Sequence, residues 1–265
     1  MGRLRSMERS EQTIQKYKKE LCELMEFMEG KELTKENLIL WKHLIEEKYC
    51  PSGVNGRLTA VNGFFSFLGR YDLRMKLLKI QKEIFIKEEK ELTKDEYRRL
   101  VSTAEKRGSK RLSLIIQTIC ATGIRVSELQ FITVESIQQQ EITIRNKNKN
   151  RKVPLIRELQ EMLNDYVIEK NIPSGPIFTD KNKKPLERQN IYNMLQTIAA
   201  NAGIDKRKAH PHALRHFFAK SFYDKTHDLV MLSNILGHSD ISTTKNYVTG
   251  TFEELCNEME EIGIL

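Results

Sequence analysis

Apolar side chains at helical spacing run through almost the whole sequence, and strand-like alternation interrupts them at one place, residues 141–155. In residues 8–29 the apolar positions recur every three or four residues, as expected for one face of a helix: Ile14, Tyr17, Leu21, Leu24, Met25 and Met28. Similar patterns predict three further helices, at 34–48, 55–69 and 72–86, with a turn at Pro51–Gly53. A chain patterned in this way is restricted to a mainly α fold of the α+β class.

A charged segment without apolar spacing, Lys87–Glu91, separates two blocks of helical pattern. Thr93 and Glu96 then form the sequence signature of a capping box, which opens a new helix. The 265 residues suit one large domain or two modest ones. We therefore expect a helical domain over 1–88, a second domain over 89–265, and a linker that lets the two close around a partner.

The interruption of the helical pattern predicts a β-hairpin. Ile142 and Ile144 alternate with polar residues, a turn passes through Asn146–Asn150, and the chain returns through Val153 and Leu155. The tip is strongly basic and carries Lys147 and Lys149. We expect a small antiparallel sheet in which a further strand near Val134–Ile137 joins this hairpin.

The charge of the chain is uneven. Lys and Arg number 44 against 36 Asp and Glu, a net charge of +8. Residues 89–247 hold 27 basic and 18 acidic side chains, whereas residues 248–265 hold five acidic side chains and no basic one. A basic body favours a polyanionic partner, and nucleic acid is preferred over membrane because no basic amphipathic helix or lipidation motif is evident. The alternative is a surface that is simply rich in lysine.

The cysteine spacing and the lack of long apolar segments argue against a metal site and against a membrane protein. Cys22, Cys50, Cys120 and Cys256 are scattered without metal-ligand spacing, which favours free thiols in a reducing compartment. The sequence contains neither the apolar run of a signal peptide nor a segment of about 20 apolar residues. We expect a cytoplasmic protein, associated with the nucleoid, that has no membrane partner.

Polar residues that could take part in catalysis occur in two helical segments. In "CATGIRVSEL", Arg125 follows a Thr-Gly helix stop and Glu128 lies one turn further on. In "HPHALRHFFAKSF", His212 and Arg215 share a helix face, which we expect to point away from the core. The opposite face carries the residues expected to be buried: Leu214, Phe217, Phe218 and Ser221. Each pair could also be an ordinary surface pair, with Arg125 bound to Glu128.

The segment "ILGHSDISTTKNYV" adds a histidine and a tyrosine. His238 follows Gly237, a helix-stopping glycine, and Ser239 or Asp240 can cap a new helix that runs through Tyr247. The apolar stripe of that helix contains Ile241, Thr244 and Val248, and Tyr247 lies off it. Taken alone, Tyr247 could be a half-buried packing residue and His238 a capping residue.

Together these residues suit chemistry at a phosphodiester. Arginine guanidinium groups pair with phosphate oxygens and can neutralise a transition state that a metal ion would otherwise stabilise. A tyrosine hydroxyl can be the nucleophile if a base or a cationic surround activates it. A lysine on the hairpin could protonate the departing sugar 5′-oxygen. No Asp/Glu cluster typical of a metal site accompanies them, and we expect neither a metal nor a cofactor.

At these residues the chain resembles the tyrosine recombinase (phage integrase) family, in particular its compact Xer-like members. The resemblance rests on "ATGIRVSEL", "HALRH", "LGHSDISTTKNY" and the basic hairpin, and covers most of residues 92–250. It implies that Tyr247 is the nucleophile, that Arg125 and Arg215 clamp the phosphate, that His212 is the base and that His238 hydrogen-bonds the phosphate. Glu128 would support this set.

The resemblance also implies roles for the hairpin and for both ends of the chain. The general acid would be Lys147, with Lys149 as the alternative, because the tip departs from the family's Gly-Lys-Gly pattern. Residues 1–88 would be a core-type DNA-binding domain, and 89–265 the catalytic domain. Residues 251–265 have an apolar stripe of Phe252, Leu255, Met259 and Ile262, and would form a helix that is exchanged between subunits of a homotetramer on two duplex DNA sites.

The function favoured by the sequence is site-specific DNA recombination through a 3′-phosphotyrosyl intermediate and a Holliday junction, without metal or ATP. Two alternatives remain open. A type IB topoisomerase would use the same chemistry to rejoin the original strand, and a DNA-binding regulator could have lost catalysis.

Overall fold

The structure, a computed structural model, describes residues 10–80, 91–146, 149–238 and 240–245. The chain divides into two compact units, Met1–Glu83 and Ile84–Leu265, and the boundary predicted near residue 89 lies in the undescribed segment between them. Among the described residues, no helix is both long and apolar enough to cross a membrane. The cysteines in this part of the chain, Cys22, Cys50 and Cys120, are free.

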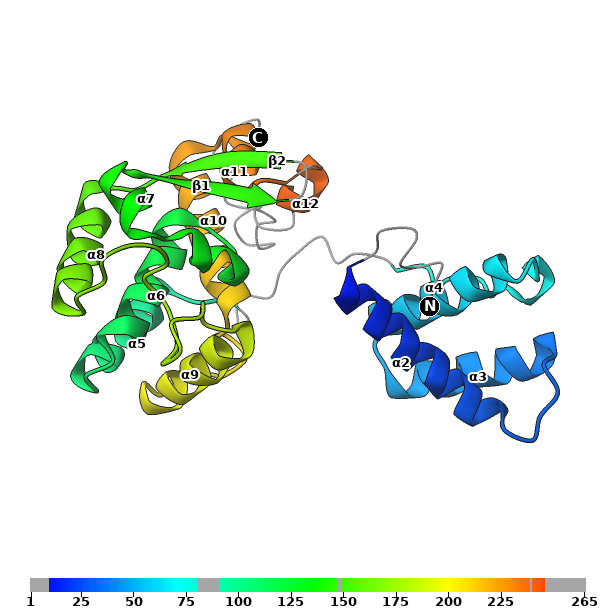
Figure 1. Cartoon of the computed structure of the whole chain (residues 1–265). Coiled ribbons are helices and arrows are strands. Elements are labelled where there is room, and N and C mark those ends of the chain that lie inside the picture. The colour runs from blue at the N-terminus through cyan, green and yellow to red at the C-terminus, as the bar shows by residue number, and fades with distance from the viewer. Residues whose placement is uncertain (1–9, 81–90, 147–148, 239, 246–265) are drawn as a thin grey trace, which may run out of the picture. The chain divides into compact units, whose positions relative to one another are not determined.

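The described residues of the first unit form three α-helices and a short 3-10 helix (Figure 1): α2 Glu11–Met28, α3 Lys35–Lys48, α4 Pro51–Phe67 and η1 Tyr71–Leu73. Ser10 and Thr34 cap α2 and α3, since each side-chain oxygen accepts a hydrogen bond from a backbone N–H three residues on. The helices enclose a core whose largest member is Trp41. The helices predicted at 8–29 and 34–48 are thus confirmed.

Two local predictions in this unit are wrong. Pro51–Gly53 is the first turn of α4 and not a loop, because a proline at the start of a helix lacks an N–H that would have no helical partner anyway. Met25 is 71% exposed, although it shares the predicted apolar stripe of α2.

The helix predicted at 72–86 is also wrong for residues 74–80, which form no regular helix or strand. Two asparagines of α4 hold this segment. The Asn62 side chain accepts from the Met75 N–H and donates to its carbonyl, both at 2.8 Å, and Asn55 makes the same pair of bonds with Leu78 at 2.8 and 3.0 Å. The seven-residue step from Asn55 to Asn62 along a helix rises about 10.5 Å, and the three-residue step from Met75 to Leu78 along an extended chain spans roughly 10 Å. The two asparagines are therefore spaced to bind an extended chain.

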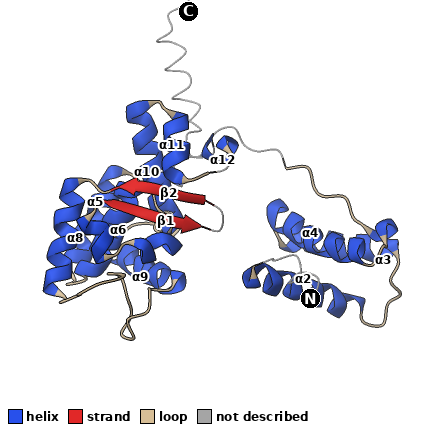
Figure 2. Cartoon of the chain, turned by 45° about the horizontal axis from the view of Figure 1, so that its top comes forward, coloured by secondary structure: helices blue, strands red, loops and turns tan. Residues whose placement is uncertain are grey.

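The part of the second unit that the structure describes is a helical body with one β-hairpin. Its α-helices are α5 Lys94–Lys106, α6 Lys110–Thr122, α7 Val134–Gln138, α8 Arg157–Glu169, α9 Arg188–Asn201, α10 Pro211–Thr226, α11 Leu229–Leu236 and α12 Ile241–Lys245, and η3 Val126–Phe131 is a 3-10 helix. Strands β1 Glu141–Asn146 and β2 Lys149–Pro154 form a two-stranded antiparallel sheet. Both overall views place β2 beside α11 (Figure 2). The predicted mainly α class is confirmed.

The two strands of the hairpin extend further toward its tip than the sequence pattern suggested. Ile144 pairs with Arg151 and Asn146 pairs with Lys149, so most of the predicted turn at Asn146–Asn150 belongs to the strands. The predicted third strand near Val134–Ile137 is wrong, because these residues form α7. Thr133 and Ser136 form its capping box: each hydroxyl oxygen accepts from the other's backbone N–H, at 3.1 and 2.9 Å.

The helix α10 lies against both α6 and α11. Gly123 ends α6 in the left-handed conformation, with φ of +64°, and a Cβ there would lie 2.3 Å from the Phe218 ring of α10. A glycine is needed at this position both for the backbone turn and for the close approach. The segment that follows Gly123, with Arg125, is therefore held directly against α10.

Candidate active site

Arg125 and Glu128 bind each other at the start of η3. The Arg125 N–H donates to Glu128 Oε2 at 2.7 Å, and Arg125 Nη1 donates to Oε1 at 3.0 Å. Glu128 is 2% exposed, whereas the Arg125 side chain is 37% exposed. Arg125 and Glu128, which the sequence allowed to be an ordinary surface pair, thus consist of a buried carboxylate and a guanidinium group that reaches solvent.

Arg215 is buried, contrary to the expectation that it points away from the core. A helical wheel defines its face on α10, but both α6 and α11 cover that face. Its Nη1 donates to the Gly123 carbonyl at 2.6 Å, and its Nη2 donates to the Leu236 carbonyl at 2.8 Å. These bonds join the end of α6 to the end of α11.

His238 lies next to Arg215 at the end of α11. Its Nε2 is 2.9 Å from Arg215 Nη2, and its Nδ1 is 2.8 Å from Thr244 Oγ1. Because a guanidinium group only donates, Nε2 accepts and Nδ1 carries the proton. Burial and then the positive charges of Arg215 and Arg125 lower the pKa of His238 to about 4. The imidazole is therefore neutral at pH 7 in the DNA-free protein.

The sequence analysis missed Arg151 on β2. Its Nη1 and Nη2 donate to Glu128 Oε1 and Oε2 at 2.9 and 2.7 Å, and its Nε donates to the Ile235 carbonyl at 3.0 Å. Strand alternation was the available signal, since position 151 falls on the same face as Val153, whose side chain is buried. A charged residue at such a position needs a buried partner.

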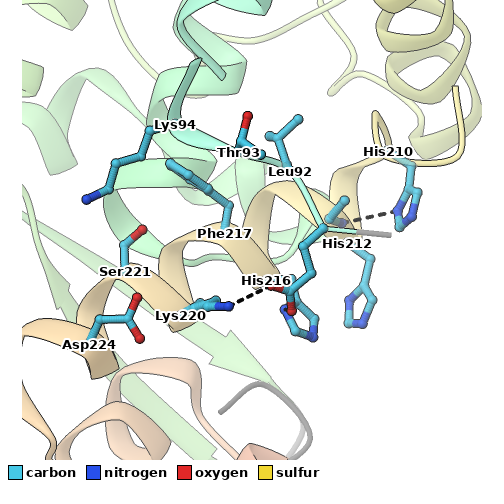
Figure 3. A pocket seen from close by; sticks show the side chains of 12 residues that line it. Leu92, Thr93, Lys94, His210, His212, His216, Phe217, Lys220, Ser221 and Asp224 are labelled. Atoms are coloured by element: carbon cyan, nitrogen blue, oxygen red, sulfur yellow. Dashed lines mark hydrogen bonds and ion pairs between the residues drawn. The ribbon is translucent and has the colours of Figure 1, made fainter. Parts of the chain in front are cut away.

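His212 lies on the exposed side of α10, near enough to Arg215 and His238 to interact electrostatically with both. It lines a cavity of about 580 Å³ between α10 and residues 91–94, which Figure 3 shows with the rings of His212 and His216 side by side. Burial and then the neighbouring His216 lower the pKa of His212. Arg125, Glu128, Arg215 and His238 are not part of the cavity lining.

Other histidines have structural partners. His210 caps α10, since its Nδ1 accepts from the Ala213 N–H at 3.1 Å, and His216 lies 3.8 Å from Glu91 Oε1. In α12, Thr244 is buried as expected, whereas Ile241 is exposed and the predicted apolar stripe is wrong at that position.

Several predicted residues lie outside the described part of the chain. These are Lys147, Ser239, Tyr247, Val248 and the segment 251–265. Lys149 is described as the first residue of β2, paired with Asn146. Of the predicted set, the structure brings together Arg125, Glu128, Arg215 and His238.

The phage integrase family model matches residues 90–254, more than half of the chain and the whole of the cluster just described. The chain belongs to the phage integrase family. It is thus a tyrosine-type site-specific recombinase.

Curated relatives agree with this assignment. Tyrosine recombinase XerD of Halalkalibacterium halodurans is 29% identical over 264 residues, covering 90% of this chain and 87% of that protein. Tyrosine recombinase XerA of Pyrococcus furiosus is 28% identical over 267 residues, covering 97% of this chain and 90% of that protein.

Solved recombinase structures share the fold. A crystal structure of XerA recombinase is 25% identical, with a TM-score of 0.58 and coverage of 100% of this chain and 96% of that one. The XerH site-specific recombinase, bound to its difH substrate before cleavage, gives a TM-score of 0.74 at 21% identity and covers 95% of this chain and 79% of that one. The likeness to XerH supports the fold of this recombinase.

Proposed function

We propose that this recombinase cleaves and rejoins DNA through a 3′-phosphotyrosyl bond at Tyr247, and exchanges strands between two duplex sites through a Holliday junction. One observation carries the proposal: the family's two arginines and the second histidine converge in one place. Arg215 contacts His238 directly, and it binds the carbonyl of Gly123, two residues before Arg125. The cluster therefore concentrates positive charge where an anionic phosphate would bind.

The chemistry assigns a role to each residue. The Tyr247 oxygen would attack phosphorus and break the bond to the 5′-oxygen, leaving a 3′-phosphotyrosine and a 5′-hydroxyl. Arg125 and Arg215 would neutralise the charge of the pentavalent transition state, so the proposed mechanism needs no metal-dependent step and no ATP. His212, which its lowered pKa keeps neutral, would take the tyrosine proton, and Lys147 or Lys149 would protonate the 5′-oxygen.

His238 would change its hydrogen-bonding role when DNA binds. In the DNA-free protein its Nε2 accepts from Arg215. A bound phosphate would replace it as the acceptor, and the negative charge would raise the His238 pKa from about 4. A proton on Nε2 would then allow His238 to donate to the phosphate.

The proposed partner is double-stranded DNA that contains paired recombination sites. Residues 1–88 would be a second DNA-binding unit, and four copies would assemble on two sites by exchanging residues 251–265. Related structures support the DNA partner: XerH is bound to difH, and a lambda integrase dimer is bound to a COC′ core site.

The test uses duplexes that the full-length protein selects from a random-sequence pool, each with a nick near the cleavage site so that the covalent adduct is trapped. We expect the wild type to form an adduct and Tyr247→Phe to bind the duplex without forming one. Tyr223→Phe and Tyr192→Phe are matched controls that should retain the adduct. If Tyr247→Phe retains it, the assignment of the nucleophile is wrong.

A second assay separates strand exchange from simple relaxation. Two duplexes that carry the selected site and flanks of different length should yield products with exchanged flanks. Relaxation of a supercoiled plasmid without exchanged flanks would indicate a topoisomerase, and binding without an adduct would indicate a regulator that lacks catalysis.

A further inference from the structure

Every nitrogen of the Arg151 guanidinium group has a hydrogen-bond partner within 3.0 Å. Two nitrogens form a fork on the Glu128 carboxylate, and the third binds the Ile235 carbonyl at the end of α11. The Arg151 side chain is only 13% exposed. It is therefore committed to the interior of the protein rather than presented to DNA.

Glu128 shares its carboxylate equally between two arginines. Each of its oxygens accepts one hydrogen bond from Arg125 and one from Arg151. Burial alone would raise the pKa of Glu128, but these bonds outweigh it and the pKa lies below its ordinary value. A buried carboxylate that stays ionised requires this cationic surround.

Arg151 and Arg215 join the same two segments of the chain. Arg215 links the Gly123 carbonyl to the Leu236 carbonyl, and Arg151 links Glu128 to the Ile235 carbonyl. One segment carries Arg125 and the other leads to His238. The two arginines come from α10 and from β2, so the hairpin contributes directly to the spacing between Arg125 and His238.

Gly237 shows how closely Arg151 fits. A Cβ at Gly237 would lie 2.7 Å from Arg151 Cδ and 2.9 Å from Nη1, and its φ is +67°. The helix-stopping glycine before His238 thus makes room for the Arg151 side chain as well as turning the backbone.

We propose that Arg151 is a positioning residue for phosphate binding, which acts through Glu128 on Arg125 and through the end of α11 on His238. The inference rests on the proposed function of this site. Without Arg151, the buried Glu128 would keep Arg125 as its one cationic partner among those described here. Arg125 would then be drawn toward Glu128 and away from the phosphate, and the His238 turn would lose one of its two arginine links.

The experiment measures release of the leaving strand from a selected, nicked duplex; this strand ends in a 5′-hydroxyl, or in a 5′-thiol for the phosphorothiolate. Three substrates are compared: the ordinary phosphodiester, a methylphosphonate that removes the negative charge at the scissile position, and a 5′-bridging phosphorothiolate whose sulfur leaves without a proton. The variants are Arg151→Ala and Arg151→Lys. Lys152→Ala is the matched control, because it removes one positive charge from the same strand, where the side chain is 71% exposed and pairs with Glu141.

We expect Arg151→Ala to lower the rate on the ordinary duplex by about 10- to 100-fold, the range typical when the partner that holds a functional side chain is removed. The ratio of wild-type to variant rates should shrink on the methylphosphonate, since there is less charge to neutralise. It should not shrink on the phosphorothiolate. The cleavage rate of Arg151→Lys should lie between those of the wild type and Arg151→Ala, because one point charge cannot form the fork. The rate of Lys152→Ala should match that of the wild type.

Three results would overturn the inference. The first is an Arg151→Ala cleavage rate equal to that of the wild type, and the second is a loss of rate in Arg151→Ala that is equally large on the phosphodiester and the methylphosphonate. The third is a near wild-type rate of Arg151→Ala on the phosphorothiolate, which would mean that Arg151 acts through the hairpin lysine. If Arg151→Ala does not fold, as judged by thermal unfolding, the same substrate comparison on Arg151→Lys decides. A wild type that forms no adduct would contradict the proposed function itself, which distinguishes the two failures.

Discussion

At the scale of single residues, replacing each arginine of this site would remove different interactions. Arg215 is almost completely buried and binds two backbone carbonyls, so its replacement removes structural bonds as well as a charge. Arg125 has a side chain that is 37% exposed and is the cleaner probe of phosphate binding. The same motif chemistry therefore predicts different experimental behaviour for the two residues.

We expect Arg125→Ala to raise the barrier to cleavage by about 2.7–4 kcal/mol, as for the loss of one donor to a transition-state oxyanion. Arg125→Lys should recover little of this, because an ammonium group does not replace the guanidinium fork. Single-turnover cleavage rates on saturating duplex measure the effect. Arg98→Ala is the control, since the Arg98 side chain is 75% exposed and pairs with Asp95 on the surface of α5. A lysine variant that cleaves like the wild type would contradict the bidentate argument.

The ionisation of His238 gives a second prediction at this scale. In the free protein its pKa is about 4, so it stays neutral as the pH falls through the ordinary histidine value of 6.5. A bound phosphate stabilises the charged form and raises this pKa, so DNA binding should take up a proton and tighten as the pH falls from 7 toward 5. NMR titration of histidine ring carbons, free and with duplex, measures the shift directly. His227, in the left-handed position that ends α10, is the internal reference, and an unchanged His238 pKa in the complex would refute the role.

At the scale of elements, the sequence predicted most of what depends on local chemistry, apart from the start of α4 and the helix α7, and it missed what depends on tertiary partners. The helices, the hairpin and the glycine stops at Gly123 and Gly237 follow from spacing and backbone preference. The extended chain at 74–80 does not, because Asn55 and Asn62 hold it from a different element. Arg151 was missed for the same reason: its partner Glu128 is 23 residues away in sequence, and periodicity shows a face without showing what covers it.

The hairpin carries the third prediction. If Lys147 protonates the leaving 5′-oxygen, Lys147→Ala should cleave an ordinary duplex slowly and a 5′-bridging phosphorothiolate at nearly the wild-type rate, because a thiolate leaves without a proton. Lys149→Ala should then show no such rescue. Rescue of Lys149→Ala alone would transfer the role to Lys149, and rescue of neither would remove the hairpin from proton transfer.

At the scale of the whole molecule, charge and assembly are linked through the acidic end of the chain. Residues 248–265 hold five acidic side chains and no basic one, in contrast to the basic body before them. An acidic segment is repelled by DNA phosphates and is free to bind protein. If residues 251–265 form the expected helix, its apolar stripe, which begins at Phe252, would be buried either on its own catalytic unit or on a neighbouring copy.

We expect deletion of residues 251–265 to leave binding to a single site nearly intact, while tetramer formation on two sites and recombination are strongly reduced. Exchange of the segment between subunits would tie the position of the nearby Tyr247 to assembly, so adduct formation on isolated sites should change as well. A full-length variant with Phe252→Ser and Leu255→Ser is the matched comparison, because it removes apolar contacts and keeps the acidic charges. Native-gel mobility and flank exchange measure both steps. If the deletion protein forms tetramers and recombines like the wild type, exchange of the segment between subunits is ruled out. If the serine variant behaves like the wild type while the deletion protein does not, assembly requires the acidic charges and not the apolar contacts.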